Sequence, residues 1–182
     1  DGKDTYMPWR RWLSTSDNRS IIVERRSRLV TMLLEIGISA VAITSATNRL
    51  YYSGFTGSNG ILLISIHGSC LITDSRYTEQ AQYECPDVDI VQQSRTQSQL
   101  ANLVKSFDIE KLGIEADDIT YSQYSKINDE IGADRQLIPL TNEINILRSV
   151  KDPEEIRLIE KAIYLADLGM SKAIDFIEPG VT

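Results

Sequence analysis

The chain has 182 residues, of which 42% are hydrophobic and 25% are charged, a composition typical of one soluble globular domain. Its formal net charge of -7 argues against a nucleic-acid-binding surface, which would need clustered positive charge. No apolar run approaches the roughly 20 residues that span a bilayer, so we expect no membrane-spanning segment.

The first twenty residues lack the apolar core of a signal peptide, and we expect residues 1–20 to form a flexible extension. Residues 20–36 are predicted to form a helix, because apolar residues recur on one stripe and Gly37 follows where a left-handed cap would end it. This helix carries a basic cluster that we interpret as a solvated face and not as a phosphate site: Arg25, Arg26 and Arg28.

The middle of the chain alternates between strand-like and helix-like segments. A tight antiparallel hairpin is predicted at His67-Gly68. Helices are expected from Asp74 or Ser75, and, on capping-box patterns, over residues 96–107 and 120–131. We therefore predict an α/β fold with a mixed β-sheet flanked by helices on both faces. The strands are expected at residues 40–46, 50–55, 61–66 (as a central strand), 69–73, 88–91, 111–115 and 136–140.

The segment from residue 151 to 182 is predicted to be a long linker helix. Asp152-Pro153-Glu154-Glu155 supplies an N-cap, a proline at the first helical position and a capping-box glutamate. An apolar seam follows at spacings of three and four residues. It could pack on the rest of the domain, but we favour docking onto a further domain or a second copy of the chain, because the helix is long and lies beyond the last strand. The seam consists of Ile156, Ile159, Ile163, Ala166, Met170, Ala173 and Ile177.

Candidate catalytic groups are few. A serine triad would need His67, the only histidine, beside a nucleophile such as Ser75. Hydrolysis by zinc or manganese would need several convergent histidine and carboxylate ligands. The pattern supports neither, so we predict no catalytic residue and no metal site in this chain. Cys70 and Cys85 are expected to be reduced thiols of a cytosolic protein.

The glycine-rich segment 54–60 could be taken for a phosphate-binding loop. Such a loop needs a following helix and usually ends in Gly-Lys-Ser/Thr, whereas a strand-like segment begins here at Ile61. We interpret residues 54–60 as a connection between strands in which the glycines adopt positive φ angles.

The cluster Asp74-Ser75-Arg76-Tyr77 has two interpretations. Asp74 or Ser75 caps the next helix while Arg76 pairs with a nearby acid and Tyr77 packs; or Arg76 is held where it meets a carboxylate of a substrate or a partner subunit. The residues alone favour the first. Residues 115–118 (EADD) could likewise invite a cation, but a solvated loop before the next helix is the interpretation we favour.

An ordered set of segments resembles the N-terminal domain of the creatinase, prolidase and aminopeptidase P family, and the Xaa-Pro peptidase branch is the most similar. The order and spacing of the segments between residues 22 and 150 make the resemblance specific. They are residues 48–58 (NRLYYSGFTGS), the hairpin, 73–77 (TDSRY), 112–115 (LGIE), and 147–151 (LRSVK) followed by 154–156 (EEI).

The resemblance implies that residues 21–150 form the creatinase-like N-terminal domain and that residues 151–182 lead into a catalytic domain. In such proteins that later domain holds two divalent metals, usually manganese, cobalt or zinc, which activate water to attack the bond before proline. The metal ligands would then lie past Thr182. We expect the non-catalytic half of a cytoplasmic Xaa-Pro aminopeptidase or dipeptidase, with a proline-containing peptide as substrate and no cofactor in this chain.

The resemblance also implies that the N-terminal domain supports homo-oligomerisation and shapes substrate access. The residues matching the rim of the active site, or an oligomer contact, are Tyr52, Ser53, Phe55, Thr56 and Arg76. Two rival functions stay open. One is a stand-alone interaction module of the same fold without peptidase activity, and the other is creatine-type amidino hydrolysis or methionine removal on the same scaffold.

Overall fold

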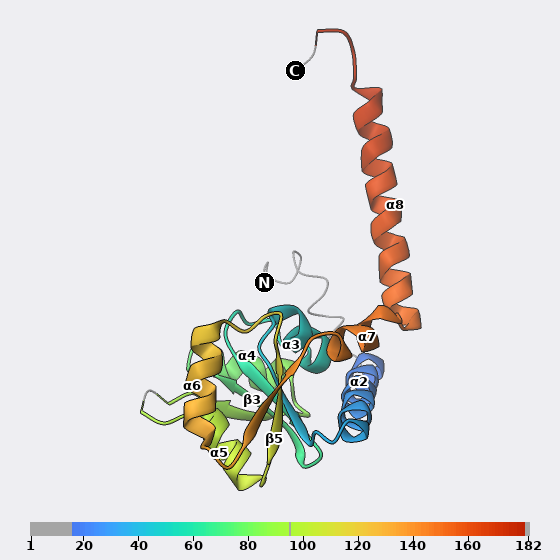
Figure 1. Cartoon of the computed structure of the whole chain (residues 1–182). Coiled ribbons are helices and arrows are strands. Elements are labelled where there is room, and N and C mark those ends of the chain that lie inside the picture. Colours follow the sequence, from blue (N-terminus) through green and yellow to red (C-terminus); the bar gives the residue numbers. More distant parts are fainter. Residues whose placement is uncertain (1–15, 95, 181–182) are drawn as a thin grey trace. The chain divides into compact units, whose positions relative to one another are not determined.

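The computed structural model describes residues 16–94 and 96–180 (Figure 1). The chain divides into two compact units, one ending at Ile144 and one beginning at Asn145, and each is described by itself. Within the described residues, no helix combines the length and apolar character needed to cross a membrane.

The first unit is built on a six-stranded sheet in the order β4-β3-β2-β1-β5-β6. β2 is antiparallel to both β1 and β3, whereas the pairs β1–β5, β5–β6 and β3–β4 are parallel. The predicted mixed sheet and β2–β3 hairpin are therefore confirmed, and so is the central strand at Ile61, whose residues 62–64 are fully buried. The strands are β1 (Ala40–Ile43), β2 (Ile61–Ser65), β3 (Gly68–Thr73), β4 (Asp89–Gln92), β5 (Lys111–Glu115) and β6 (Gln136–Leu140).

Helices cover both faces of this sheet, as predicted. Ala40 and Ala42 of β1 belong to a core cluster with apolar side chains of α5 and α6. α2 and α3 pack together, α2 contacts β1 and β2, and α3 contacts β2. Figure 1 shows α6 and α2 on opposite sides of the sheet. Alternate strand residues point to opposite faces, so the sheet separates two apolar layers. The described helices are α2 (Ser16–Glu35), α3 (Ala46–Ser53), α4 (Thr78–Glu84), α5 (Gln99–Ser106), α6 (Tyr121–Ile131), α7 (Glu143–Ser149) and α8 (Pro153–Asp175).

The predicted strand at residues 50–55 is wrong, because α3 occupies this segment. Ser45 caps the helix by accepting a hydrogen bond from the Asn48 backbone N–H. Gly54 ends the helix in the left-handed conformation at φ 81°, and its N–H donates a hydrogen bond to the Leu50 carbonyl. The adjacent tyrosines favour a strand by intrinsic propensity, but the two caps and the burial of one face override that preference.

Several helix boundaries also differ from the predictions. α4 begins at Thr78 and not at Asp74 or Ser75, and α5 is capped by Ser98 instead of Thr96. The capping box at Thr120 is confirmed, as is the left-handed Gly37, with φ 74°. α7 was not predicted. The part of the expected N-terminal extension before residue 16 lies outside the described residues, and α2 begins within the remainder.

The arginine cluster on α2 is not a solvated face. Arg25 and Arg26 are buried, and only Arg28 is exposed, where it pairs with Glu24. Arg26 donates to the Tyr52 carbonyl at 2.9 Å and forms an ion pair with Asp87. These contacts tie α2 to segments 26 and 61 residues further along the chain, which a local pattern cannot reveal.

The second unit contains α8. Its N-terminus is the predicted capping box, in which Glu155 N–H donates to Asp152 at 2.9 Å and Asp152 N–H donates to Glu155 at 3.1 Å. The helix ends at Asp175, so Ile177 of the predicted seam lies beyond it. Taken by itself, α8 is an amphipathic helix that buries none of its side chains.

Candidate functional site

Two connections of the chain meet at one edge of the sheet. Residues 54–60 join α3 to β2, and residues 74–77 join β3 to α4. Because Ile61 pairs with Ile72, both connections lie where the parallel strands β1 and β3 end. The Thr73 hydroxyl ties them together by donating to the Asn59 carbonyl at 2.7 Å. In α/β sheets, the carboxyl ends of parallel strands are the usual place for ligand-binding loops.

Glu84 of α4 holds the first half of the 54–60 connection. Its carboxylate accepts hydrogen bonds from the Thr56 backbone N–H at 2.9 Å and from the Thr56 hydroxyl at 2.8 Å. Gln80, one turn earlier on α4, donates to the same carboxylate at 3.1 Å and to the Thr56 hydroxyl at 2.8 Å. Three side chains therefore form a closed network around one backbone amide.

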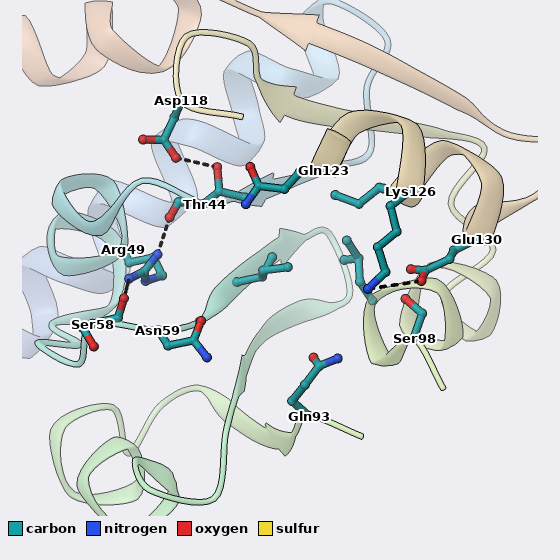
Figure 2. Close-up of a pocket in the computed structure, with 14 residues that line it drawn as sticks. Thr44, Arg49, Ser58, Asn59, Gln93, Ser98, Asp118, Gln123, Lys126 and Glu130 are labelled. Atoms are coloured by element: carbon teal, nitrogen blue, oxygen red, sulfur yellow. Dashed lines mark hydrogen bonds and ion pairs between the residues drawn. The ribbon is translucent and has the colours of Figure 1, made fainter. Parts of the chain in front are cut away.

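Arg49 of α3 holds the second half. Its guanidinium donates to the Thr44 carbonyl and to the carbonyls of Gly57 at 3.4 Å and Ser58 at 3.2 Å (Figure 2). Burial lowers the pKa of Arg49, and the nearby carboxylate of Asp118 opposes that shift. A buried cation that donates only to backbone carbonyls in this way fixes the path of the main chain.

The glycines of the connection have distinct roles. Gly54 adopts the positive φ angle that was predicted, but Gly57 and Gly60 do not. At Gly57 a Cβ atom would come within 2.8 Å of Phe55 Cε1 and closer still to Cζ, so the absence of a side chain lets the Phe55 ring lie underneath. Of the glycines in the connection, only Gly54 has a backbone conformation that requires a glycine.

A phosphate-binding role for this region is not supported by the geometry. At the N-terminus of α3, the carboxylate of Glu115 already accepts the backbone N–H groups of Thr44 at 2.5 Å and Ser45 at 2.7 Å. Glu115 therefore occupies the position that an anionic ligand would take. Since Glu115 is buried, the interpretation of residues 115–118 as a solvated loop is wrong for this residue.

The Asp74–Tyr77 cluster follows the first interpretation in part. Arg76 pairs with Asp74, with Nη2 2.8 Å from Oδ2 and Nε 3.0 Å from Oδ1, and these hydrogen bonds hold the pKa of Asp74 well below its usual range. Tyr77 packs edge-on against Phe55 and lies 2.7 Å from the Ser58 hydroxyl. The predicted capping of α4 by Asp74 or Ser75 is wrong, because Tyr77 precedes the helix and makes no side-chain cap bond.

The structure places the five residues matched to the rim on these two connections and the end of α3. Tyr52, Ser53 and Phe55 are buried, so they support the connection from beneath. Thr56 is half-buried and Arg76 is exposed. The anchors of the connection, Arg49 and Glu84, were missed by sequence reasoning, because a charged residue on a short helix usually indicates a solvent-facing position.

A cavity of about 350 Å³ adjoins the 54–60 connection (Figure 2). Four charged side chains line it: Arg49 and Asp118 on one side and Lys126 and Glu130 of α6 on the other, where Lys126 points toward Glu130 at 3.9 Å. Its lining includes neither histidine nor cysteine. The cavity is therefore polar and of mixed charge.

His67 and Ser75 cannot act together. His67 lies in the turn before β3, with its ring 5.6 Å from that of Phe107, and Ser75 follows the other end of β3. The six-residue strand between them spans roughly 20 Å. Among residues 16–94 and 96–180, no three His, Cys, Asp or Glu side chains converge so as to hold a metal, so these residues do not fit the two divalent ions that the resemblance implies.

Comparison with known proteins gives a consistent result. Residues 25–150 match the family described as the Creatinase/Prolidase N-terminal domain. The chain is 36% identical over 156 residues to a Bacillus subtilis protein described as the uncharacterized peptidase YqhT, covering 85% of this chain and 44% of that protein. It is 28% identical over 166 residues to the Xaa-Pro dipeptidase of Pyrococcus furiosus, covering 86% of this chain and 44% of the relative. The chain thus spans less than half the length of these relatives.

Solved structures share the fold. The Xaa-Pro dipeptidase from Bacillus anthracis superimposes with a TM-score of 0.82 at 36% identity, over 88% of this chain and 45% of that one. The N-terminal domain of the cytoplasmic peptidase PepQ from Mycobacterium tuberculosis gives a TM-score of 0.64 at 29% identity, over 69% of this chain and 98% of that one. The sheet order, the sequence match and these structures agree, and the chain belongs to the creatinase/prolidase N-terminal domain family.

Proposed function

We propose that this chain is the non-catalytic N-terminal part of a longer Xaa-Pro peptidase, an aminopeptidase or a dipeptidase. The observation that carries the proposal is that residues 25–150 match an N-terminal domain family while relatives such as the Pyrococcus furiosus Xaa-Pro dipeptidase are about twice as long. Two divalent metals, manganese, cobalt or zinc, would be held by the remaining half of the longer protein, and no catalytic step is assigned to the residues described here.

The test uses the longer polypeptide. Purified with Mn²⁺, it should hydrolyse an Xaa-Pro dipeptide but not the matching Xaa-Ala dipeptide, and a chelator should abolish the activity. Equal hydrolysis of both dipeptides would contradict the proposed specificity for proline. Hydrolysis of creatine in place of the dipeptide would favour the alternative function, creatine-type amidino hydrolysis.

The second part of the proposal concerns assembly. The seam of α8 presents large apolar side chains, including Ile163 with 56% and Met170 with 64% of their surface exposed. We propose that the chain contributes to a homo-oligomer and that the seam docks either onto a second copy or onto the remaining half of the longer protein. An amphipathic helix that buries nothing in its own unit supports this role, because its apolar face gains stability only when it is covered.

The third part concerns substrate access. The 54–60 connection and Arg76 are proposed to form part of the rim over a proline-containing peptide. Thr56 and Arg76 are the matched residues that reach the surface, and Asp74 holds the Arg76 guanidinium in a fixed orientation. Tyr52, Ser53 and Phe55 would act indirectly, by supporting the connection from the core side.

A cytoplasmic location is also proposed. Cys70 and Cys85 are both free and buried, which fits a reducing compartment. The similar Mycobacterium tuberculosis protein is described as cytoplasmic.

A further inference from the structure

Glu84 is a buried carboxylate in a position that does not favour helix stability. It is the last residue of α4, and only 9% of its surface is exposed. A negative charge at the C-terminal end of a helix is unfavourable, and so is the burial of a carboxylate. The hydrogen bonds that offset these costs go mainly to Thr56, which lies 28 residues earlier in the chain.

We propose that Glu84 is a positioning residue, which holds Thr56 and with it the first half of the 54–60 connection in a preformed arrangement. The connection would then be a rigid rim that meets its ligand already shaped, and not a lid that orders on binding. The functional part of this inference rests on the proposed role of the connection in substrate access. The structural part stands on the Glu84 contacts alone.

The geometry makes the effect local. The second half of the connection does not depend on Glu84. Arg49 donates hydrogen bonds to the carbonyls of residues 57 and 58, and the Thr73 hydroxyl donates to the Asn59 carbonyl. Removing the Glu84 acceptor should therefore loosen Thr56 while the strand β2 that follows stays unchanged. This gives each measurement an internal reference within the same molecule.

The informative variant is Glu84→Gln. It keeps the size of the side chain but removes its charge, so the hydrogen bond from the Thr56 N–H becomes a neutral one, and the new NH₂ group must turn the Thr56 hydroxyl or displace the Gln80 amide. Glu79→Gln is the matched control, because Glu79 lies on the same helix, is exposed and loses the same charge.

Amide hydrogen exchange of the 182-residue chain tests the structural part. In Glu84→Gln the Thr56 amide should exchange about tenfold faster than in the wild type, because its hydrogen bond to a charged carboxylate is replaced by a weaker, neutral one. The exchange rate of the Leu62 amide in β2 should be unchanged in Glu84→Gln, and the exchange rates of the Thr56 and Leu62 amides should both be unchanged in Glu79→Gln. Equal Thr56 exchange in Glu84→Gln and the wild type overturns the inference. Should Glu84→Gln fail to fold, Glu84→Asp keeps the charge but shortens the side chain by one methylene, which withdraws the acceptor from the Thr56 N–H. The Thr56 amide should then exchange several-fold faster than in the wild type, and an unchanged exchange rate would overturn the inference equally.

Steady-state kinetics of the longer polypeptide test the functional part. Glu84→Gln should raise KM for an Xaa-Pro dipeptide about tenfold with kcat retained, whereas Glu79→Gln should leave both constants unchanged. A merely structural residue would lower the stability without moving KM. If the Thr56 amide exchanges faster but KM is unchanged, Glu84 still positions the connection, whereas the proposed role of the connection in substrate access is overturned. The two proposals can therefore fail separately.

Discussion

Glu115 at the end of β5 accepts a hydrogen bond from the backbone N–H of Ser45, the N-cap of α3, at 2.7 Å. The same carboxylate accepts the N–H of Thr44 and the side-chain amide of Asn48, so one buried acid satisfies the donors at the start of the helix. This contact joins two parallel strands through the helix that follows one of them. It therefore sets where α3 begins, and with it where the 54–60 connection leaves the helix.

The first prediction concerns this carboxylate. Glu115→Gln should lower the free energy of unfolding by about 2–3 kcal/mol, because several charge-assisted hydrogen bonds become neutral ones and the new NH₂ group faces the side-chain amide of Asn48. Urea denaturation measures the loss. Asp117→Asn, which removes a charge from an exposed neighbour, should change the stability by less than about 0.5 kcal/mol. Equal effects of the two substitutions would show that Glu115 does not organise α3.

The second prediction concerns the basic cluster of α2. Arg26→Met should destabilise the chain by about 3 kcal/mol, because it leaves Asp87 and the Tyr52 carbonyl without the guanidinium that contacts them. Arg28→Met on the same helix removes an exposed charge and should cost less than about 1 kcal/mol. The contrast is measured by thermal or urea unfolding. A cost as small for Arg26→Met as for Arg28→Met would restore the interpretation of a uniform solvated face.

The third prediction is a pH dependence. Burial raises the pKa of the Cys85 thiol to about 12, from an ordinary value of 9.0. Between these values the unfolded chain loses the thiol proton while the folded chain keeps it, so the free energy of unfolding falls as pH rises, by up to about 4 kcal/mol over the whole window. Below pH 9 this group should make no pH-dependent contribution.

Urea denaturation at pH 8 and pH 11 measures this dependence. Cys85→Ala should lose about 2.5 kcal/mol less than the wild type between the two values. Cys70→Ala is the matched control and should keep the larger part of the fall, since burial also raises the pKa of Cys70 but not to the degree seen for Cys85. An identical fall in the wild type and Cys85→Ala would contradict the assignment.

The fourth prediction concerns the seam of α8. The 182-residue chain should self-associate with increasing concentration, because the seam would otherwise stay in contact with water. Ile163→Lys should weaken the association at least about tenfold, since burial of one large apolar side chain contributes roughly 1.5–3 kcal/mol. Sedimentation velocity over a concentration series measures it. Ala162→Lys adds the same charge outside the seam and should have little effect; a wild-type chain that stays monomeric at every concentration would rule the seam out as a contact between copies.

The sequence predicted the fold where local pattern and tertiary environment agree. The strands at residues 111–115 and 136–140 are short apolar segments between turn residues, and the structure places β5 and β6 at those bounds. The capping boxes at Thr120 and Asp152 are formed by neighbours in the chain, so they too were visible. α3 was missed because Tyr51 and Tyr52 favour strands.

The candidate site was predictable only in outline. The family resemblance proposed the 54–60 connection and Arg76 as parts of the rim, but it did not indicate which side chains reach the surface. Glu115 and Asn48 are 67 residues apart, and Glu84 and Thr56 are 28 apart, so no spacing rule links the partners. The sequence does not distinguish a carboxylate that will be buried from a solvated one, because its hydrogen-bond donors come from distant parts of the chain.

The most direct test of the central claim, that catalysis belongs to the remaining half of a longer protein, is an assay of the 182-residue chain itself. The purified chain is incubated with Mn²⁺ and an Xaa-Pro dipeptide, with and without a chelator, beside the longer polypeptide at equal concentration. We predict no chelator-sensitive hydrolysis by the 182-residue chain and clear turnover by the longer one. Chelator-sensitive cleavage of the dipeptide by the 182-residue chain alone would contradict the account.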